Sequence, residues 1–101
     1  MKTSIHGLHK VFESRIRLGI MSALMVNQKL DFNEFKQLLD LTDGNLASHL
    51  TALEKHRFIQ VKKQFVGKKP NTSYAATELG RQKFTEHLNT LEALIKKVSQ
   101  K

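Results

Sequence analysis

The chain has 101 residues, which is enough for one modest folded unit and leaves little room for a second. Its 40% hydrophobic and 26% charged residues are typical of a globular protein, without a stretch that predicts disorder or a membrane span. Cysteine is absent, which excludes a disulfide framework and a thiolate metal site. Because the first ten residues also lack the apolar core of a signal peptide, we expect a cytoplasmic protein without a membrane partner.

The strongest global feature is the charge. Seventeen Lys and Arg residues against nine Asp and Glu residues give a formal net charge of +8 at pH 7. Such an excess on a short chain indicates a polyanionic partner. Charge alone does not distinguish a nucleic acid from an acidic membrane surface or from a basic surface without a partner.

The first quarter of the chain has apolar residues at every fourth position. These are Leu8, Phe12, Ile16, Ile20 and Leu24. The spacing predicts a helix over residues 8–25 with one buried face. After it, Leu30 and Phe32 alternate with polar residues as in a very short strand. Residues 33–39 then predict a short second helix with Leu38 on its inner side.

A third helix is predicted to follow directly. It begins after Thr42, whose hydroxyl can cap the free amides of the first turn, and ends at about His56. At 100° per residue, one stripe of this helix is apolar and consists of Leu46, Leu50 and Leu53. The opposite face consists of Ser48, Thr51, Ala52 and Lys55. One face is therefore anchored, and the other is free to contact a partner.

A β-hairpin with a basic tip is predicted over residues 58–76. Residues 58–66 are rich in β-branched and aromatic side chains, and residues 72–76 return as a second strand. Between them, Gly67 and Pro70 supply turn chemistry. Proline lacks an amide hydrogen and belongs in the loop or at a sheet edge.

The last predicted helix covers residues 78–99, after Thr77 as its cap. Its apolar positions step by four, three, four and three: Phe84, Leu88, Leu91, Ile95 and Val98. This is a heptad seam on a rod of roughly 30 Å, long enough for a dimer arm. Little chain remains to cover the distal part of the seam, so we expect a homodimer. The expected interface residues are Leu8, Leu88, Leu91, Ile95 and Val98.

The order helix, helix, turn, helix, hairpin, helix predicts the fold. It is mainly α with a small β-hairpin, a winged helix-turn-helix that carries a helical dimerisation arm. We expect one domain over residues 1–101, with the helix-turn-helix at about 33–56, the wing at about 58–76 and the dimerisation helix at about 78–99. In this arrangement the third helix enters the major groove of double-stranded DNA, and the hairpin reaches the flanking backbone.

Several segments carry a resemblance to a known family. They are the stretch SRIRLGIMSAL at 14–24, the third-helix segment 45–50, the wing 62–77 and the Thr-Glu-Leu-Gly at 77–80. Together they resemble the winged-helix regulators of the ArsR and MarR superfamily, especially their small stand-alone bacterial and archaeal members. The resemblance implies a transcriptional regulator that binds double-stranded DNA. Arg57 departs from the family, which usually has glycine there.

Residue chemistry nominates the DNA contacts. Base edges lie deep in the major groove, so a recognition helix needs short polar side chains near its N-terminal end, and Asn45 could pair with the edge of adenine. Lysines in the wing suit phosphates or the minor groove, although Lys62 and Lys63 must point to opposite faces of their strand. The candidate contacts are Asn45, Ser48, Thr51, Lys55, Lys62, Lys68 and Lys69.

Three further basic side chains have a structural alternative. His49 lies on the flank of the leucine stripe, where we expect a half-buried structural histidine. Arg17 and Arg81 are weaker phosphate candidates, because each could instead pair with a carboxylate such as Glu13 or Glu78.

Other functional classes find little support in the sequence. The pair His6 and His9 has the spacing of helical metal ligands, but without cysteine or paired acidic ligands we expect no metal and no cofactor. Phosphate-binding loops, nucleophile elbows and clustered acid pairs are missing, so we expect no enzyme. The main alternative is a winged-helix module that binds an acidic protein partner, which should show exposed apolar anchors. A small-molecule effector pocket between the dimer arm and the wing is a further possibility.

Overall fold

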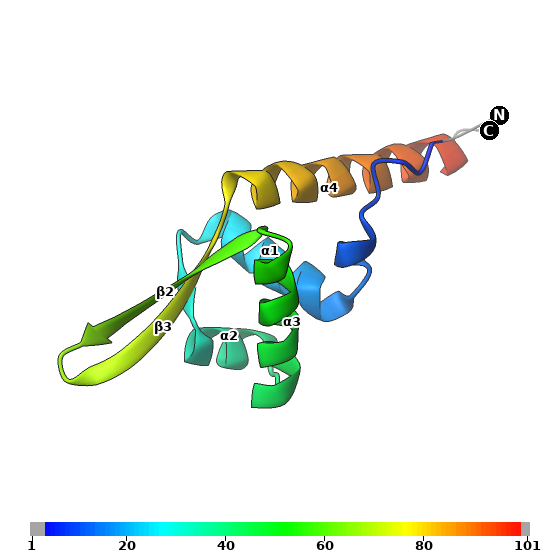
Figure 1. The fold of residues 1–101 in the computed structure, drawn as a ribbon. Helices are drawn as coiled ribbons and strands as arrows, with labels where there is room; N and C mark the ends of the chain where they lie inside the picture. The colour runs from blue at the N-terminus through cyan, green and yellow to red at the C-terminus, as the bar shows by residue number, and fades with distance from the viewer. Residues whose placement is uncertain (1–3, 100–101) are drawn as a thin grey trace.

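The computed structural model describes residues 4–99 (Figure 1). In chain order the elements are a 3₁₀ turn η1 (Lys10–Phe12), α1 (Arg15–Val26), β1 (Leu30–Asp31), α2 (Phe32–Leu39), α3 (Asp43–Lys55), β2 (Ile59–Val66), β3 (Lys69–Ala76) and α4 (Glu78–Ser99). This is the predicted winged helix-turn-helix, mainly α with a small antiparallel sheet. Among the described residues, none of the helices combines the length and apolar character that a membrane span requires.

The first helix begins later than its apolar spacing predicts. Ser14 has an extended backbone and its hydroxyl accepts a hydrogen bond from the Arg17 amide at 3.3 Å, so it caps a helix that starts at Arg15. Phe12 lies in η1 and is nevertheless fully buried. The spacing therefore identified which side chains are buried, and the predicted helix start at residue 8 was wrong.

The sheet has the strand order β1-β3-β2, and both pairings are antiparallel. A two-residue turn that begins at Gly67, with φ at 66°, joins β2 to β3, so β3 starts at Lys69 rather than at residue 72. Pro70 consequently lies within the strand. Because β1 pairs with β3 only at Ser73 and Tyr74, the β1 side of β3 is open at Pro70 and no ladder hydrogen bond is lost there.

The core lies between the helices and the inner face of the sheet. Phe12 is central to it, since its ring centroid lies 5.3 Å from that of Phe58 and 5.2 Å from that of Phe84. These contacts join η1, the connection between α3 and β2, and the first half of α4 in one aromatic cluster. The fully buried large side chains are Phe12, Phe35, Phe84, Ile20, Met21, Leu24, Leu46, Leu53 and Ile59.

One predicted core position in α2 was wrong. Leu38 is 59% exposed, whereas Phe35 in the same helix is fully buried. Phe35 is buried, and Phe32 and Leu39 of the same helix also pack against the core, so α2 is anchored without Leu38.

The connection from α3 to β2 keeps a glycine-like geometry without glycine. Arg57 has φ at 63°, in the left-handed region that favours glycine. Its amide donates to the carbonyl of Glu54 at 2.9 Å, and the amide of Phe58 donates to the carbonyl of Leu53 at 3.0 Å. This pair of bonds is a Schellman motif, and the side chains of Phe58 and Leu53 are both buried in the core.

Replacing Arg57 with glycine is therefore expected to stabilise the protein by about 0.5–1 kcal/mol. The substitution removes the strain that a residue with a Cβ has in the left-handed conformation. The larger conformational entropy of glycine in the unfolded chain offsets part of this gain in stability. Urea unfolding measures it. Asp40→Gly, at a second left-handed residue that is not glycine (φ at 51°), serves for comparison and should gain less, because aspartate tolerates this conformation better. A loss of stability in Arg57→Gly would contradict the strain.

Candidate nucleic-acid interface

The outer face of α3 is polar and exposed. Ser48, Thr51 and Lys55 follow one another along this face, opposite the buried leucines, and all three are exposed. Asn45 is also exposed but lies on the flank of the face, near the N-terminal end of the helix. The hydroxyl of Ser48 donates to the carbonyl of Asn45 at 3.2 Å and keeps its lone pairs as acceptors.

The N-terminal end of α3 is fixed by two side chains. Thr42 caps the helix as expected, since its hydroxyl accepts from the Asn45 amide at 3.3 Å. Asp43, at the first position of the helix, forms an ion pair with Lys36 of α2. Sequence reasoning missed this pair because the two residues lie on different helices, where no spacing rule applies. The charge of Lys36 offsets that of Asp43, the acidic residue in the first turn of α3, which would otherwise repel a polyanion at this end of the helix.

His49 is held in place by an arginine of α1. The Nε of Arg17 donates to Nδ1 of His49 at 3.0 Å, and its guanidinium also donates to the carbonyl of Val11 at 3.3 Å. His49 is half-buried, in agreement with its expected structural role. Burial and the charge of Arg17 lower the pKa of His49 below its ordinary value. Arg17 thus joins α1 to α3 and pairs with a histidine rather than with a carboxylate.

Arg81 has a similar structural role at the start of α4. Its guanidinium donates to the carbonyl of Leu24 at 3.1 Å and to that of Met25 at 3.5 Å, which satisfies the C-terminal end of α1. These contacts favour a role in positioning α4 over the phosphate contact or carboxylate pairing considered from the sequence.

The hairpin is a basic arm that extends away from the helices (Figure 1). Residues 59–76 contain four lysines and neither Asp nor Glu, and all four lysines are exposed. Lys62 lies opposite Ser73 and Lys63 opposite Thr72, so the two neighbours lie on opposite faces, as expected. Lys68 and Lys69 lie at the turn.

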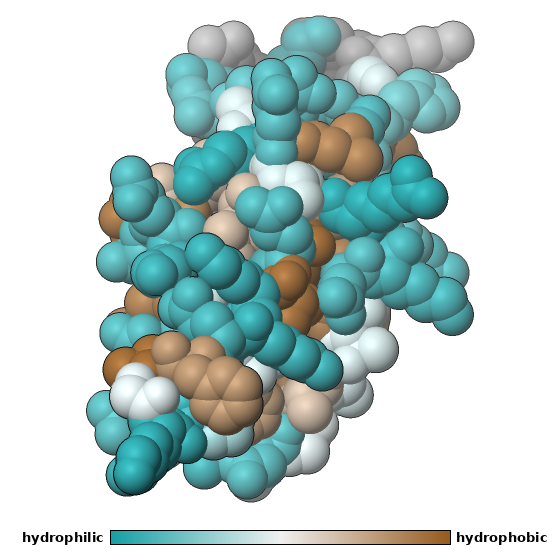
Figure 2. Space-filling view, turned by 60° about the vertical axis from the view of Figure 1, so that its left-hand side comes forward, coloured by the Kyte–Doolittle hydropathy of each residue, from teal (hydrophilic) through white to brown (hydrophobic). Residues whose placement is uncertain are grey.

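The two faces of the hairpin differ in what they meet. Tyr74 packs toward Phe35 of α2, with ring centroids 6.1 Å apart, so the face that contains Tyr74 and its partner Val61 is the inner face. Lys63 shares this inner face and Lys62 does not. A hollow of about 310 Å³ lies between this part of β3 and the start of α2. Turned to bring the hairpin forward, the molecule shows a largely hydrophilic surface with a few separate apolar patches (Figure 2).

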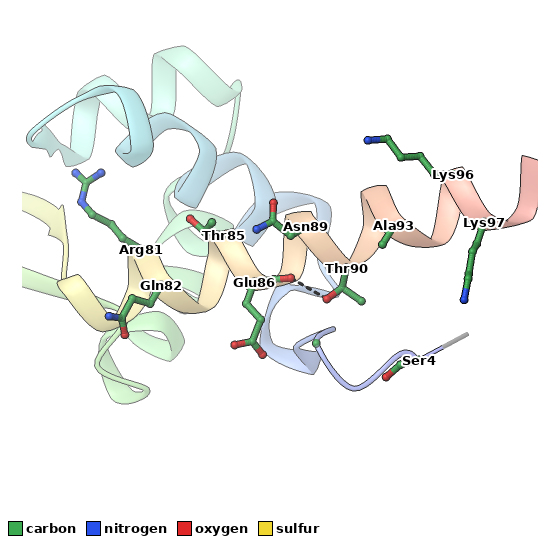
Figure 3. A pocket seen from close by; sticks show the side chains of 11 residues that line it. Ser4, Arg81, Gln82, Thr85, Glu86, Asn89, Thr90, Ala93, Lys96 and Lys97 are labelled. Carbon is green, nitrogen blue, oxygen red and sulfur yellow. Dashed lines mark hydrogen bonds between the residues drawn. The ribbon is translucent and has the colours of Figure 1, made fainter. Parts of the chain in front are cut away.

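The N-terminal segment runs beside α4 at the end of the molecule opposite the hairpin (Figure 1). The amide of His9 donates to Nδ1 of the buried His87 at 3.0 Å, and Gly7 packs against the side chain of Thr90. A hollow of about 980 Å³ lies along α4 beside residues 4–7, lined mostly by polar and charged side chains of α4 (Figure 3). It does not lie between the arm and the wing, where an effector pocket was considered. No group of three potential metal ligands occurs within residues 4–97.

The expected dimer residues lie on one side of α4 and beside it. Leu88 is 41% exposed and Ile95 is 68% exposed, while Leu91 and Leu8 are half-buried. Val98 lies in α4, but its side chain is outside the described residues. The radius of gyration is 15.6 Å, against about 13 Å for a compact chain of this length, because both α4 and the hairpin extend beyond the body (Figure 1).

The two histidines with a lowered pKa, the buried His87 and the half-buried His49, predict a pH-dependent stability. Burial and the nearby His9 lower the pKa of His87, although Glu13 acts in the opposite direction, and His49 is shifted downward as well. Protonation at Nδ1 would also remove the bond from the His9 amide. With folded pKa values below the unfolded value near 6.5, the unfolded chain binds more protons as the pH falls. The free energy of unfolding should therefore be constant above about pH 6.5 and fall below it, by at most about 1.4 kcal/mol per pH unit for each histidine.

Urea unfolding between about pH 7.5 and pH 5 measures this dependence. The double variant His49→Asn with His87→Asn is the control, because an asparagine oxygen can still accept from the His9 amide but does not titrate. Its stability should change less over the same interval. An equal dependence in both proteins would contradict the assignment to these two histidines.

Comparison with known proteins agrees with the geometry. Residues 16–95 match the model of a family described as a winged helix DNA-binding domain. The uncharacterized protein MJ0432 of Methanocaldococcus jannaschii is 34% identical over 89 residues, which cover 88% of this chain and 97% of that protein. The structure of a transcriptional regulator homologue from Pyrococcus horikoshii is 31% identical with a TM-score of 0.78, and the match covers 94% of this chain and 99% of the other.

A more distant structure shows the same fold. It is a transcriptional regulator of the MarR family from Porphyromonas gingivalis, 18% identical with a TM-score of 0.67, covering 90% of this chain and 84% of the other. The predicted resemblance to winged-helix regulators is thus confirmed by the family model and by the regulator homologue at 31% identity. With most of its length matched by the family model, the chain belongs to the winged helix DNA-binding domain family.

Proposed function

We propose that this protein is a sequence-specific transcriptional regulator that binds double-stranded DNA as a homodimer in the cytoplasm and catalyses no reaction. The observation that carries the proposal is the combination of a polar, exposed outer face on α3 with a hairpin that has four lysines and no carboxylate. The similarity to a transcriptional regulator homologue at 31% identity supports it.

In this proposal α3 reads the major groove. Ser48 and Thr51 offer short hydroxyl side chains to base edges, and Asn45 offers an amide that can pair with adenine. Lys55, one turn further along, binds a phosphate or a guanine. The ion pair between Lys36 and Asp43 supports this orientation, because it offsets the acidic charge at the leading end of the helix.

The hairpin binds the DNA backbone or the minor groove beside that site. Lys68 and Lys69 contact phosphates from the turn, which gives affinity without base identity. Lys62 can reach a phosphate only from the outer face of β2, so we expect a smaller contribution from it.

The homodimer forms along the C-terminal half of α4. Leu88, Leu91, Ile95 and Val98 continue the heptad line of Phe84 toward the C-terminal end of α4. Leu8 belongs to the same proposed interface, because its neighbour His9 is bonded to His87 of α4. Two copies that pair there would place two α3 helices for two half-sites of an operator.

The absence of exposed large apolar side chains from α3 favours a nucleic-acid partner over an acidic protein partner. Within residues 4–97, the large apolar side chains that are exposed are Ile5, Val26, Leu38, Phe65, Val66, Leu79, Leu88 and Ile95. None of them lies on α3, whereas the centre of a protein-docking face is usually formed by such anchors.

Two pairs of substitutions are expected to have different effects. Lys68→Ala with Lys69→Ala should weaken binding to every duplex by a similar factor and reduce the slope of log affinity against log salt by about 2, because each lysine releases about one counterion. Asn45→Ala and Ser48→Ala should instead reduce the preference for a duplex selected by the wild-type protein, by about 1–3 kcal/mol for each good base contact.

Fluorescence anisotropy with the selected duplex and a random duplex, each titrated at several salt concentrations, measures both effects. Gln82→Ala, an exposed polar position on α4, is the control and should change neither quantity. Equal losses on both duplexes for the α3 variants would show that α3 does not read bases, and an unchanged salt slope in the lysine variant would remove the wing from the interface.

A further inference from the structure

The wing carries an apolar side chain that folding does not explain. Phe65 is 73% exposed near the tip of the hairpin. Its cross-strand partner is Pro70, which is also exposed, so the pairing covers only a small part of the ring. The ring adds nothing to the core, and together with Pro70 it leaves an exposed apolar surface at the tip of the wing.

The register fixes the direction of this ring. Residues two apart on β2 share a face, so Phe65 lies on the same face as Val61 and Lys63. That is the inner face, which packs on α2 at the root of the hairpin through Tyr74. Phe65 and Pro70 therefore form the apolar tip of the inner face of the wing. This is the face that packs on α2 at the root of the hairpin.

The charge around Phe65 selects the partner. Lys63, Lys68 and Lys69 lie on the same arm, and residues 59–76 contain no carboxylate. The acidic side chains beside the hairpin belong to other elements. Asp31 of β1 accepts from the side chain of Asn71, and Glu34 of α2 lines a hollow with Val66 and Lys69 on the outer face. An apolar ring within a purely cationic arm is complementary to a groove with phosphates on both rims and apolar sugar and base surfaces between them.

We propose that Phe65 enters the DNA minor groove as a wedge that contacts sugars and the edge of a base step, while the lysines beside it bind the phosphates of both rims. The wedge rests on the proposed function and adds a source of specificity to it. Partial unstacking costs least at flexible pyrimidine–purine steps such as TA, so the wing selects sequence through deformability without a hydrogen bond to a base.

Phe65→Ala should then weaken binding to the selected duplex by about tenfold, because an aromatic contact to a base is lost. The salt slope should stay unchanged, since no phosphate contact is removed. Val66→Ala is the matched control: Val66 is the next residue, is 60% exposed and lies on the opposite face. Its affinity should remain within about twofold of the wild type.

A direct probe is available because the chain contains no tryptophan. In the Phe65→Trp variant the single indole reports on the wing. Its fluorescence should be strongly quenched and protected from acrylamide when the selected duplex is added, and the effect should weaken when the TA steps in the flanks of that duplex are replaced by GC steps.

The possible results separate the wedge from the proposed function. If the wild-type protein binds DNA but Phe65→Ala binds equally well, or the indole stays unquenched at saturation, the wedge is wrong and the DNA-binding function stands. If sedimentation shows that Phe65→Ala loses self-association, the ring contacts a second copy of the chain and the wedge is again wrong. If the wild-type protein binds no duplex at low salt, the proposed function fails and the wedge fails with it.

Discussion

Gly80→Ala is expected to destabilise the protein by about 3 kcal/mol. A Cβ on Gly80 would lie 2.0 Å from the carbonyl oxygen of Phe58 and within 3 Å of two further backbone atoms of that residue. Backbone atoms cannot move aside as the end of a flexible side chain can. The same carbonyl accepts a hydrogen bond from the Thr77 amide at 3.0 Å. The start of α4 is therefore fixed to the connection between α3 and β2. With a total stability of typically 5–15 kcal/mol, this loss is large.

Urea or thermal unfolding of Gly80→Ala measures the loss. Gly44→Ala is the control, because nothing lies within 4 Å of the Cβ it would carry, and alanine in a helix should stabilise by about 0.5–1 kcal/mol. The side chain of Thr77 strengthens the same junction, since its hydroxyl accepts from the Gly80 amide at 2.9 Å and donates to the carbonyl of Arg57 at 2.7 Å. Wild-type stability in Gly80→Ala would mean that α4 does not approach the turn so closely.

Leu91→Glu is expected to convert the dimer into a monomer. The substitution places a charge in the middle of the proposed α4 seam, where it would be desolvated against an apolar partner surface. Because an operator with two half-sites is bound far more tightly by two linked α3 helices than by one, affinity for such a duplex should fall by about 100-fold or more. Affinity for a single half-site should change little.

Sedimentation and anisotropy measure the two effects together. Leu91 is half-buried within the protomer, so Leu88→Glu, at a position that is 41% exposed, repeats the test with less disturbance of internal packing. Asn89→Glu introduces the same charge on the opposite side of the helix and should leave the dimer intact. An intact dimer in both leucine variants would place the seam inside the protomer.

The periodicity of the sequence was sufficient to predict the fold. Leu46, Leu50 and Leu53 were identified as the buried stripe of α3, and the outer face of that helix is exposed as expected. The range of α4 agrees with the predicted residues 78–99. These predictions succeeded because each depends on local spacing, which the chain alone contains.

What the sequence could not predict depends on contacts between elements. The apolar spacing runs from Leu8 through Phe12 without a break, yet the helix begins only after Ser14, because a 3₁₀ turn buries Phe12 equally well. The ion pair of Lys36 with Asp43 joins two helices whose relative placement no spacing rule gives.

The candidate contacts show the same limit. Strand alternation separated Lys62 from Lys63, but only the packing of Tyr74 on Phe35 identifies the inner face. The exposure of Phe65 also needed the structure, since its strand pattern alone is compatible with a core position. Which side chains touch DNA or a second copy stays a prediction.

The measurement that tests the central claim most directly is the affinity of the wild-type protein, at several salt concentrations, for duplexes selected from a random pool and for the unselected pool. Specific recognition through α3 with a cationic wing predicts strong salt dependence on both, and an affinity for the selected duplexes that is higher by about 1,000-fold or more. Equal affinity for the two pools would contradict sequence-specific regulation and leave a nonspecific DNA-binding protein. The absence of binding at low salt would contradict the DNA-binding function itself.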